Sequence, residues 1–317
     1  MKRILFIIFA IISVYLLWPE PEVELESDED LTEQIDEYED DEIADSDPVP
    51  TAEPTRALVQ PAQKVNKPIP TIIQKTSSKG SFLPPGVVQF RLLKNNWAVT
   101  HGDILLGKLE SKIQGNIGQF KPKPSVLWDS AEIPYAFGPG FSKERTEEII
   151  VALQKMSQAT IINFLLVDTT DVPKDYIIFL PSDEVCASYL GKVGGQQPIF
   201  LKDNCGEKEI MHEAMHALGF VHEQSRKDRD QFVKINWDNI KDGYDTQFQI
   251  APDAYLEHYR GFVFAFDYES IMLYSSAHFT KSPQLKTIES TTNKQIAPSQ
   301  NGLSAVDIQR INYLYNK

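Results

Sequence analysis

The sequence predicts an α+β protein in which helices cover one face of a mixed sheet. Three observations support this prediction. Strand-like and helical patterns alternate in the first half of the segment from Trp128 to Lys317, its second half is rich in loops, and a last helical pattern closes the chain. Strands that alternate with helices form a sheet that the helices cover. The chain is 42% hydrophobic, which is enough for a sizeable core and excludes disorder throughout.

The first half of this segment supplies strands and a helix. The apolar stretches 133–137, 161–167 and 176–180 are typical of strands. Between the first two, Ser142 can cap a helix that runs to about Ala159 and carries apolar residues on one side. We therefore expect strand, helix, strand and strand in this order.

Two more helices are expected further along the chain. Gly206 precedes a helical pattern at about 207–217, and a loop-rich stretch with scattered aromatic residues begins at Phe220. Ser304 and Asp307, three residues apart, form a capping box that opens a final helix. Residues 125–317 are expected to form one folded domain.

The N-terminal sequence predicts an export signal. A short basic start is followed by an apolar stretch at 4–18, so residues 1–18 are expected to be a signal peptide or a signal anchor. We favour the anchor, because no small-residue cleavage site follows the apolar stretch. The protein is thus expected to be exported, and either secreted or anchored through 4–18 to the outer face of the membrane or cell envelope.

The net charge of -14 comes from a local tract. Residues 20–47 hold 16 acidic and no basic residues, whereas 48–317 has 29 of each sign. Acidic and proline-rich composition with few apolar residues predicts that 19–81 is a disordered tether. No segment has a basic excess, which argues against a nucleic-acid partner. Residues 82–124 have some strand-like content, too little for a domain, and are expected to lean on another part of the protein.

One histidine-rich stretch has the spacing of a metal site. His212 and His216 are four residues apart on the expected helix, so their imidazoles face the same way. Gly219 can end that helix, and His222 can return as a third ligand. Three neutral imidazoles bind one Zn²⁺ and leave a position for water. Glu213 can reach that water without ligating and take its proton.

The residues around this motif resemble the astacin family of metzincin metalloproteases. The run 219–230 resembles the family signature, and Ser270 to Tyr274 resembles its Met-turn, with Leu273 where the family commonly has His. The resemblance covers nearly all of the domain. It implies a metzincin-like, two-lobed fold: a mixed sheet and the active-site helix in the N-terminal lobe, and a loop-rich C-terminal lobe that ends in a helix.

The resemblance also implies residue roles. One zinc ion per chain would be held by His212, His216 and His222, with Glu213 as general base and acid. Tyr274 would be a switchable fifth ligand that stabilises the oxyanion.

Other positions take supporting roles by the same resemblance. Met272 would lie beneath the metal, and Glu223 would contact the new N-terminus of the mature enzyme. Ser188 and Tyr189 would belong to the edge strand that receives substrate. The other histidines have no ligand spacing and are expected at the surface: His101, His258 and His278.

The two cysteines, Cys186 and Cys205, lie in the part expected to be exported. An even count in an oxidising compartment favours one disulfide, with a buried free pair as the alternative. The family resemblance implies that the disulfide joins the edge strand to the start of the active-site helix.

Residues 82–124 contain a further resemblance, to the astacin propeptide motif, at His101 to Ile104. In that motif the aspartate, here Asp103, takes the water position on zinc and keeps the enzyme latent. Thr100 replaces the usual aromatic residue, and Gly-Asp-Ile alone also fits an ordinary turn. The resemblance implies a zymogen that an activating protease cuts between about Gly118 and Ser125.

The predicted function is therefore a zinc-dependent endopeptidase that acts on proteins or peptides. One alternative is a catalytically inactive, zinc-stabilised binding module tethered to the cell envelope. Such a module would have no use for Glu213 and Tyr274, which are both present. An envelope tether that works through the acidic linker is compatible as an added role.

Overall fold

A computed structural model describes residues 86–109, 117–168, 171–256 and 264–316. The expected signal segment 1–18 and tether 19–81 lie outside the described residues. Within the described ranges, no helix combines the length and the hydropathy that crossing a membrane would require.

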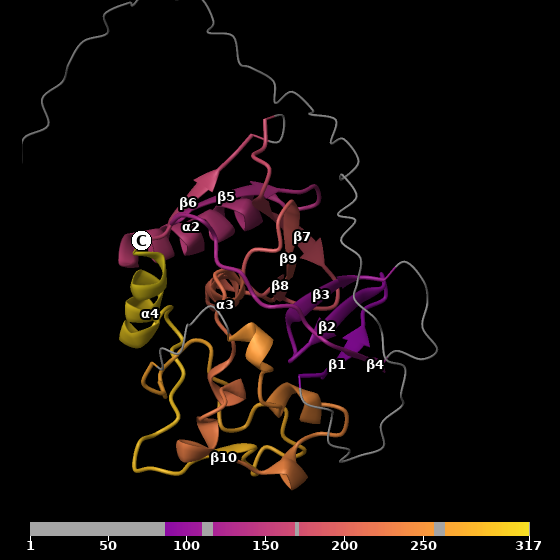
Figure 1. Ribbon diagram of the computed structural model, residues 1–317, viewed down its shortest axis with the longest axis vertical. Coiled ribbons are helices and arrows are strands. Elements are labelled where there is room, and N and C mark those ends of the chain that lie inside the picture. Colours follow the sequence, from indigo (N-terminus) through magenta and orange to yellow (C-terminus); the bar gives the residue numbers. More distant parts are fainter. Residues whose placement is uncertain (1–85, 110–116, 169–170, 257–263, 317) are drawn as a thin grey trace, which may run out of the picture. The chain divides into compact units, whose positions relative to one another are not determined.

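The described residues are organised by a mixed sheet of nine strands in the order β4-β1-β2-β3-β8-β9-β7-β5-β6 (Figure 1). The strands are β1 Val88–Leu92, β2 Trp97–Thr100, β3 Ile104–Lys108, β4 Ile117–Phe120, β5 Glu132–Phe137, β6 Asn163–Leu166, β7 Tyr176–Ser182, β8 Ala187–Tyr189 and β9 Gln196–Lys202. Strands β5, β6, β7 and β9 run parallel to one another, and β8 pairs antiparallel with β9. The mixed sheet expected from the sequence is thus present.

Strands β1 to β4, which precede the domain expected at residues 125–317, form part of the same sheet. Strands β1, β2, β3 and β4 pair antiparallel among themselves. β3 then joins β8 in parallel, with Ile104 opposite Ser188 and Leu105 opposite Tyr189. β8, which was expected to be a free edge that receives substrate, is therefore covered by the chain's own β3. The segment leans on the domain as expected, and it does so through backbone pairing.

Three helices have the boundaries that their capping residues predict. They are α2 Lys143–Ala159, α3 Glu207–Ala217 and α4 Ala305–Tyr315. The Ser142 hydroxyl accepts a hydrogen bond from the Arg145 N–H, which caps α2. Ser304 and Asp307 form the complete capping box of α4.

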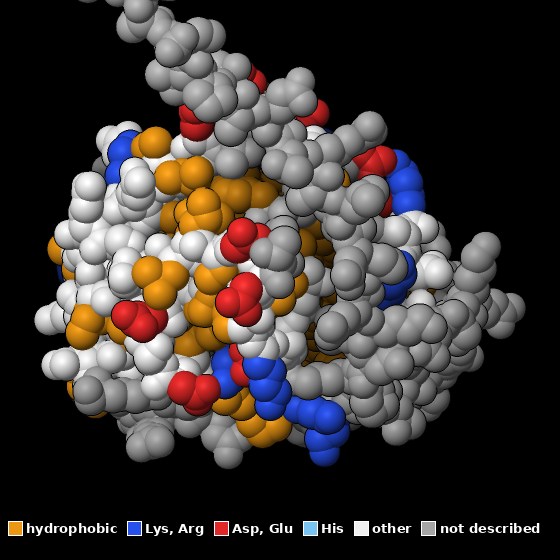
Figure 2. All heavy atoms as spheres, turned by 90° about the horizontal axis from the view of Figure 1, so that it is seen from above, with side chains coloured by type: hydrophobic (Ala, Val, Ile, Leu, Met, Phe, Trp, Pro, Cys, Tyr) orange, Lys and Arg blue, Asp and Glu red, His pale blue; other side chains and the backbone are white. Residues whose placement is uncertain are grey.

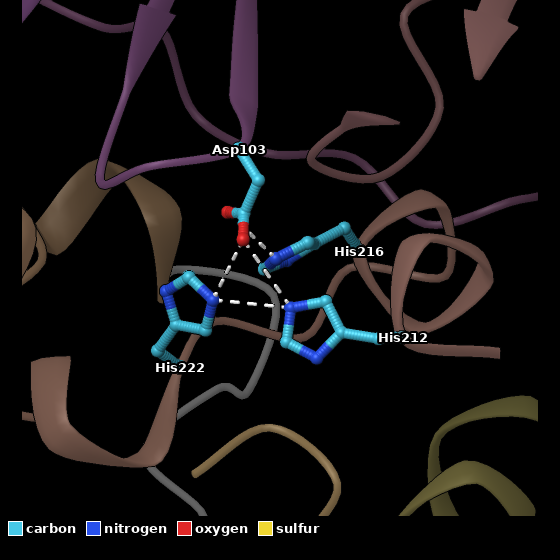
Figure 3. A group of neighbouring side chains, drawn as sticks. All are labelled: Asp103, His212, His216 and His222. Carbon is cyan, nitrogen blue, oxygen red and sulfur yellow. Dashed lines mark hydrogen bonds and ion pairs between the residues drawn. The ribbon is translucent and has the colours of Figure 1, made fainter. Parts of the chain in front are cut away.

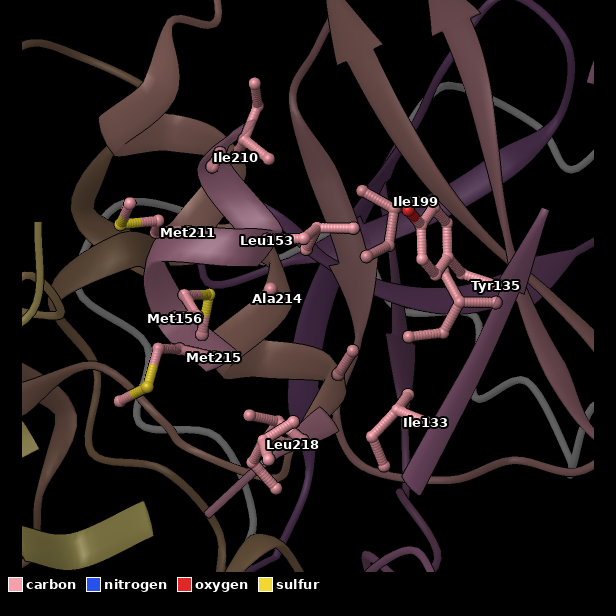
Figure 4. Close-up of a cluster of buried hydrophobic side chains, with 14 of the residues drawn as sticks. Ile133, Tyr135, Leu153, Met156, Ile199, Ile210, Met211, Ala214, Met215 and Leu218 are labelled. Atoms are coloured by element: carbon pink, nitrogen blue, oxygen red, sulfur yellow. The ribbon is translucent and has the colours of Figure 1, made fainter. Parts of the chain in front are cut away.

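The main core lies between the sheet and helices α2 and α3 (Figure 4). Ile133 of β5, Leu153 of α2 and Ile199 of β9 are each at most 1% exposed, and Ala214 and Met215 of α3 are fully buried. Burying one large apolar side chain contributes about 1.5–3 kcal/mol, so the helix that carries the histidines is firmly seated. Helix α4 belongs to this core as well.

The second lobe is loop-rich, as expected, and has a separate core around the buried Phe248. Its regular elements are short: 3₁₀ helices η1 Glu223–Ser225, η2 Arg229–Gln231, η3 Trp237–Asn239, η4 Asp245–Phe248 and η5 Asp253–Tyr255, and strands β10 Val233–Ile235 and β11 Ile288–Ser290. The two-lobed α+β architecture is confirmed.

One face of the first lobe carries exposed apolar side chains. Figure 2 shows hydrophobic side chains gathered on the face seen from above. At the β6 edge of the sheet, Val151, Ile161 and Leu166 are 43–57% exposed. The sheet ends here with β6, which pairs only with β5 among the described strands.

Cys186 and Cys205 form the expected disulfide. It joins the residue before β8 to the residue before the N-cap of α3, so it fixes the strand to the histidine helix.

Replacing both cysteines, as in Cys186→Ala with Cys205→Ala, should lower the free energy of unfolding by about 3 kcal/mol. A disulfide that closes a loop of this length restricts the unfolded chain by about that amount. Urea unfolding of the double variant and of the wild type measures the difference. Equal midpoints and slopes for the two proteins would contradict the expectation.

Candidate metal centre

Helix α3 and the turn after it bring three imidazoles together. His212 and His216 are one helical turn apart on α3. Gly219 ends the helix region with φ of 103°, a conformation that glycine adopts readily. The chain then reverses, and His222 follows in extended conformation, just before η1.

Asp103 of the preceding segment completes the cluster (Figure 3). Its carboxylate oxygens lie 3.4 Å from His212 Nε2, 3.1 Å from His216 Nε2 and 3.2 Å from His222 Nε2. The Nε2 atoms of His212 and His222 are 3.1 Å apart. All four side chains thus point at one centre, and they come from two parts of the chain more than 100 residues apart.

Hydrogen bonds at the outer nitrogens set the ring orientations. His212 Nδ1 lies 2.9 Å from the Ile271 carbonyl oxygen, and His216 Nδ1 lies 2.7 Å from that of Phe220. A carbonyl can only accept, so each Nδ1 carries the proton and each Nε2 lone pair faces the centre. Such outer contacts are typical of histidines that bind metals.

Burial favours the neutral forms of His216 and His222, whereas the neighbouring histidines favour the charged form of Asp103. Desolvation lowers the pKa of His216 and lowers the pKa of His222 to about 3. Burial alone would raise the pKa of Asp103, but His222 and His216 outweigh it and hold that pKa well below its usual value. Neutral imidazoles can offer a nitrogen lone pair to a cation, as metal binding requires.

A zinc ion fits this donor set. Among the described residues, the buried His216 Nε2 and Asp103 Oδ1 atoms have no hydrogen-bond partner. Donors about 2.0–2.1 Å from a tetrahedral Zn²⁺ are about 3.3 Å apart. Four of the donor separations here are 3.1–3.4 Å, and the donor atoms of all four residues lie within 4.8 Å of one another. The residues present can therefore hold one tetrahedral metal ion.

Glu213 lies beside the centre on α3 and is 2% exposed. Burial, followed by the charges of Asp103 and Glu209, raises the pKa of Glu213 well above its usual value. Its Oε2 atom has no hydrogen-bond partner among the described residues. A buried carboxyl with a raised pKa is typical of groups that move protons in catalysis.

The segment Ser270 to Tyr274 passes close to the histidines. Met272 is 1% exposed, and its carbonyl accepts a hydrogen bond from the Glu223 N–H. The Tyr274 ring lies 4.8 Å from the ring of His222. Burial, with Asp103 and Glu213 adding to it, raises the pKa of Tyr274 well above its usual value, so the phenol stays protonated and can donate.

Glu223 is held by two arginines. Its carboxylate lies 2.5 Å from Arg310 of α4 and 3.3 Å from Arg226, and it also accepts from the Asp267 N–H. The Glu223, Arg226 and Arg310 side chains are all largely buried. Glu223, which follows the third histidine, thus connects this turn to helix α4 and to the second lobe through ion pairs and a hydrogen bond.

The remaining histidines differ from the expectation in one case. His101 was expected at the surface, but it is 1% exposed, and burial lowers its pKa to about 4. The cause is its place beside Asp103, in the segment that enters the site. His278 is exposed as expected and stacks on the Tyr274 ring at 4.3 Å. His258 lies outside the described residues.

Two glutamines that contact Tyr274 were not predicted from the sequence. Gln224 Oε1 accepts from the Tyr274 N–H, and Gln247 Oε1 lies 3.4 Å from the Tyr274 hydroxyl. Gln224 comes two residues after the last histidine of the motif, so its position offered a signal. Gln247 lies in a loop-rich stretch, where nothing in the sequence marks it.

The fold is metzincin-like. It combines the mixed sheet, helix α3 with its two histidines, and the segment Ser270 to Tyr274. A model of the astacin family of peptidases matches residues 120–316. The chain is 39% identical over 194 residues to zinc metalloproteinase nas-13 of Caenorhabditis elegans, covering 60% of this chain and 41% of that protein. It is 32% identical over 221 residues to zinc metalloproteinase nas-4 of the same organism, covering 68% of this chain and 69% of that protein.

A solved structure is also similar. High choriolytic enzyme 1, a hatching enzyme zinc-protease from Oryzias latipes, aligns with a TM-score of 0.53 at 31% identity and covers 61% of this chain and 94% of that one. The chain belongs to the astacin family of peptidases. Its cofactor is one zinc ion.

Proposed function

We propose that this chain is a zinc-dependent endopeptidase that hydrolyses peptide bonds in proteins and is made in a latent form. The observation that carries the proposal is the convergence of three imidazoles on one point beside the buried Glu213. Relatives named zinc metalloproteinases support the same function.

In this proposal His212, His216 and His222 hold the zinc ion. When bound, zinc polarises a carbonyl group and lowers the pKa of water toward about 7. The contacts of His212 with Ile271 and of His216 with Phe220 keep the lone pairs aimed at the ion. Met272, which is buried, would lie beneath the ion.

Glu213 moves the proton. Its raised pKa suits a carboxyl that accepts a proton from water during attack and then delivers it to the leaving amine. Because the side chain is buried on a packed helix, it needs no reorganisation to do so.

Tyr274 stabilises the negative charge that develops on the carbonyl oxygen. Its raised pKa keeps the phenol protonated, so the hydroxyl can donate to that oxygen. In the uncut chain the hydroxyl lies close to two acceptors, the His101 carbonyl oxygen and Gln247 Oε1.

Asp103 makes the uncut chain latent in this proposal. Its carboxylate faces all three imidazoles, so it occupies the position that water needs. Strand β3 adds a second block, because its pairing with Ser188 and Tyr189 fills the edge at which an extended substrate would add as a strand. Residues 82–124 act as a propeptide.

Activation would follow a cut in the stretch before Ser125. Lys121 and Lys123 are exposed and offer sites to a trypsin-like enzyme. The new N-terminus would then contact Glu223, in competition with its two arginine partners. The disulfide supports an oxidising, extracytoplasmic location, and residues 4–18 could anchor the chain there.

The test is peptide hydrolysis by the processed chain, before and after zinc removal. We expect hydrolysis that a chelator abolishes and that one equivalent of Zn²⁺ per chain restores. A processed chain that binds zinc but cleaves no peptide in a diverse library would favour the inactive binding module. Hydrolysis that survives removal of all metal would contradict the mechanism.

A further inference from the structure

We propose that Gln247 is a positioning residue for the phenol of Tyr274. Its side-chain amide holds the hydroxyl at the place where it can donate to a substrate carbonyl. This inference rests on the proposed endopeptidase function and adds a residue to it.

The hydroxyl of Tyr274 has two acceptors among the described residues. One is the His101 carbonyl oxygen at 3.3 Å, and the other is Gln247 Oε1 at 3.4 Å. His101 belongs to the segment that has to leave on activation. Gln247 belongs to the protease domain itself and remains after the cut.

Gln247 is rigidly placed. It lies in η4, is 6% exposed, and its backbone N–H donates to the Tyr244 carbonyl. The next residue, Phe248, is fully buried, and its ring packs edge-on against Tyr274 at 5.7 Å. The Phe248 carbonyl also accepts from the buried Arg229. The amide therefore cannot move far from the phenol.

The chain that enters the site runs directly over this pair. A Cβ atom on Gly102 would lie 2.7 Å from the Tyr274 hydroxyl and 2.8 Å from Gln247 Oε1. Gly102 has φ of 100°, and glycine at this position lets the backbone come so close. The Tyr274 hydroxyl and the Gln247 amide therefore form one polar surface, which lies against the backbone at Gly102 and next to the histidine imidazoles.

The chemistry of an amide suits this role. A hydroxyl has one proton to donate, and a glutamine offers both an acceptor and two donors. Before attack, the amide oxygen can accept from the phenol. When the phenol donates to the charged carbonyl oxygen, a stronger acceptor, the amide nitrogen can turn to donate to the phenol oxygen. The phenol stays in place in both states.

The test is a double-mutant cycle in the processed, zinc-loaded chain. Gln247→Met keeps the length of the side chain and removes its hydrogen-bonding groups, and Tyr274→Phe removes only the hydroxyl. We expect Gln247→Met to lower kcat about 10-fold or more with KM changed less than about twofold. In the Tyr274→Phe background the same change should have almost no further effect.

Two control variants and a check of folding separate a positioning role from a structural one. Gln249→Met alters the same segment two residues away and should keep the wild-type kcat. Zinc content and thermal unfolding show whether each variant is folded. Gln247→Glu keeps an acceptor but no donor, so its kcat should lie between those of the wild type and Gln247→Met.

Equal losses from Gln247→Met in the wild-type and Tyr274→Phe backgrounds would overturn the inference, as would a wild-type kcat for Gln247→Met. Either result leaves the proposed function standing, because the wild type remains active. If no processed form hydrolyses peptides, the proposed function fails and this inference fails with it.

Discussion

Glu213→Gln is expected to reduce peptide hydrolysis by the processed chain about 10³-fold or more while the zinc ion stays bound. An amide of the same shape cannot accept the proton of the attacking water or deliver it to the leaving amine. The change removes the carboxylate and leaves His212 and His216 in place on α3. The loss should therefore appear in kcat, with little change in KM.

Glu207→Gln provides the matched control. Glu207 lies in the first turn of α3, is only partly buried and pairs with Lys155. Its variant should hydrolyse peptides at close to the wild-type rate. The measurement is steady-state kinetics together with metal analysis of both variants. Near-normal turnover by Glu213→Gln with zinc present would show that the general base has been assigned to the wrong residue.

Asp103→Ala in the uncut chain is expected to raise peptide hydrolysis about 10-fold or more above that of the uncut wild type. The carboxylate is attached to the same chain, so even a weak ligand meets the metal at a high effective concentration. Removing it opens the position for water. Activity should still stay below that of the processed chain, because β3 continues to cover β8.

Two further variants define the role of the carboxylate. Asp103→Asn keeps the shape and removes the charge, so it should release activity as well, to a smaller extent. Arg91→Ala changes an exposed residue of β1 and should leave the chain latent. The uncut and processed forms are compared on one peptide substrate. An uncut wild-type chain that is already fully active excludes latency through Asp103.

Local signals predicted much of the fold. Ser142 and the Ser304–Asp307 box marked the starts of α2 and α4, because capping depends on neighbouring residues only. The spacing of His212 and His216 placed them on one face of α3 for the same reason.

Features that depend on distant residues were not predictable in this way. β2, β4 and β9 were not predicted, since a strand is stabilised by its partners across the sheet. The pairing of β3 with β8 joins residues more than 80 positions apart. It explains why β8 is covered and also why His101, expected at the surface, is buried. Gln247 reaches Tyr274 through the packing of the second lobe, which no local pattern records.

The most direct test of the metal centre is X-ray absorption spectroscopy at the zinc edge on the uncut, zinc-loaded chain, with Asp103→Ala measured beside it. We expect three imidazole nitrogens and one carboxylate oxygen around a single zinc ion in the wild type. In the variant, the histidine signal should remain and a water oxygen should replace the carboxylate. Carboxylate-carbon scattering that persists in Asp103→Ala, or zinc bound without three histidines, would contradict ligation by Asp103 and the three histidines.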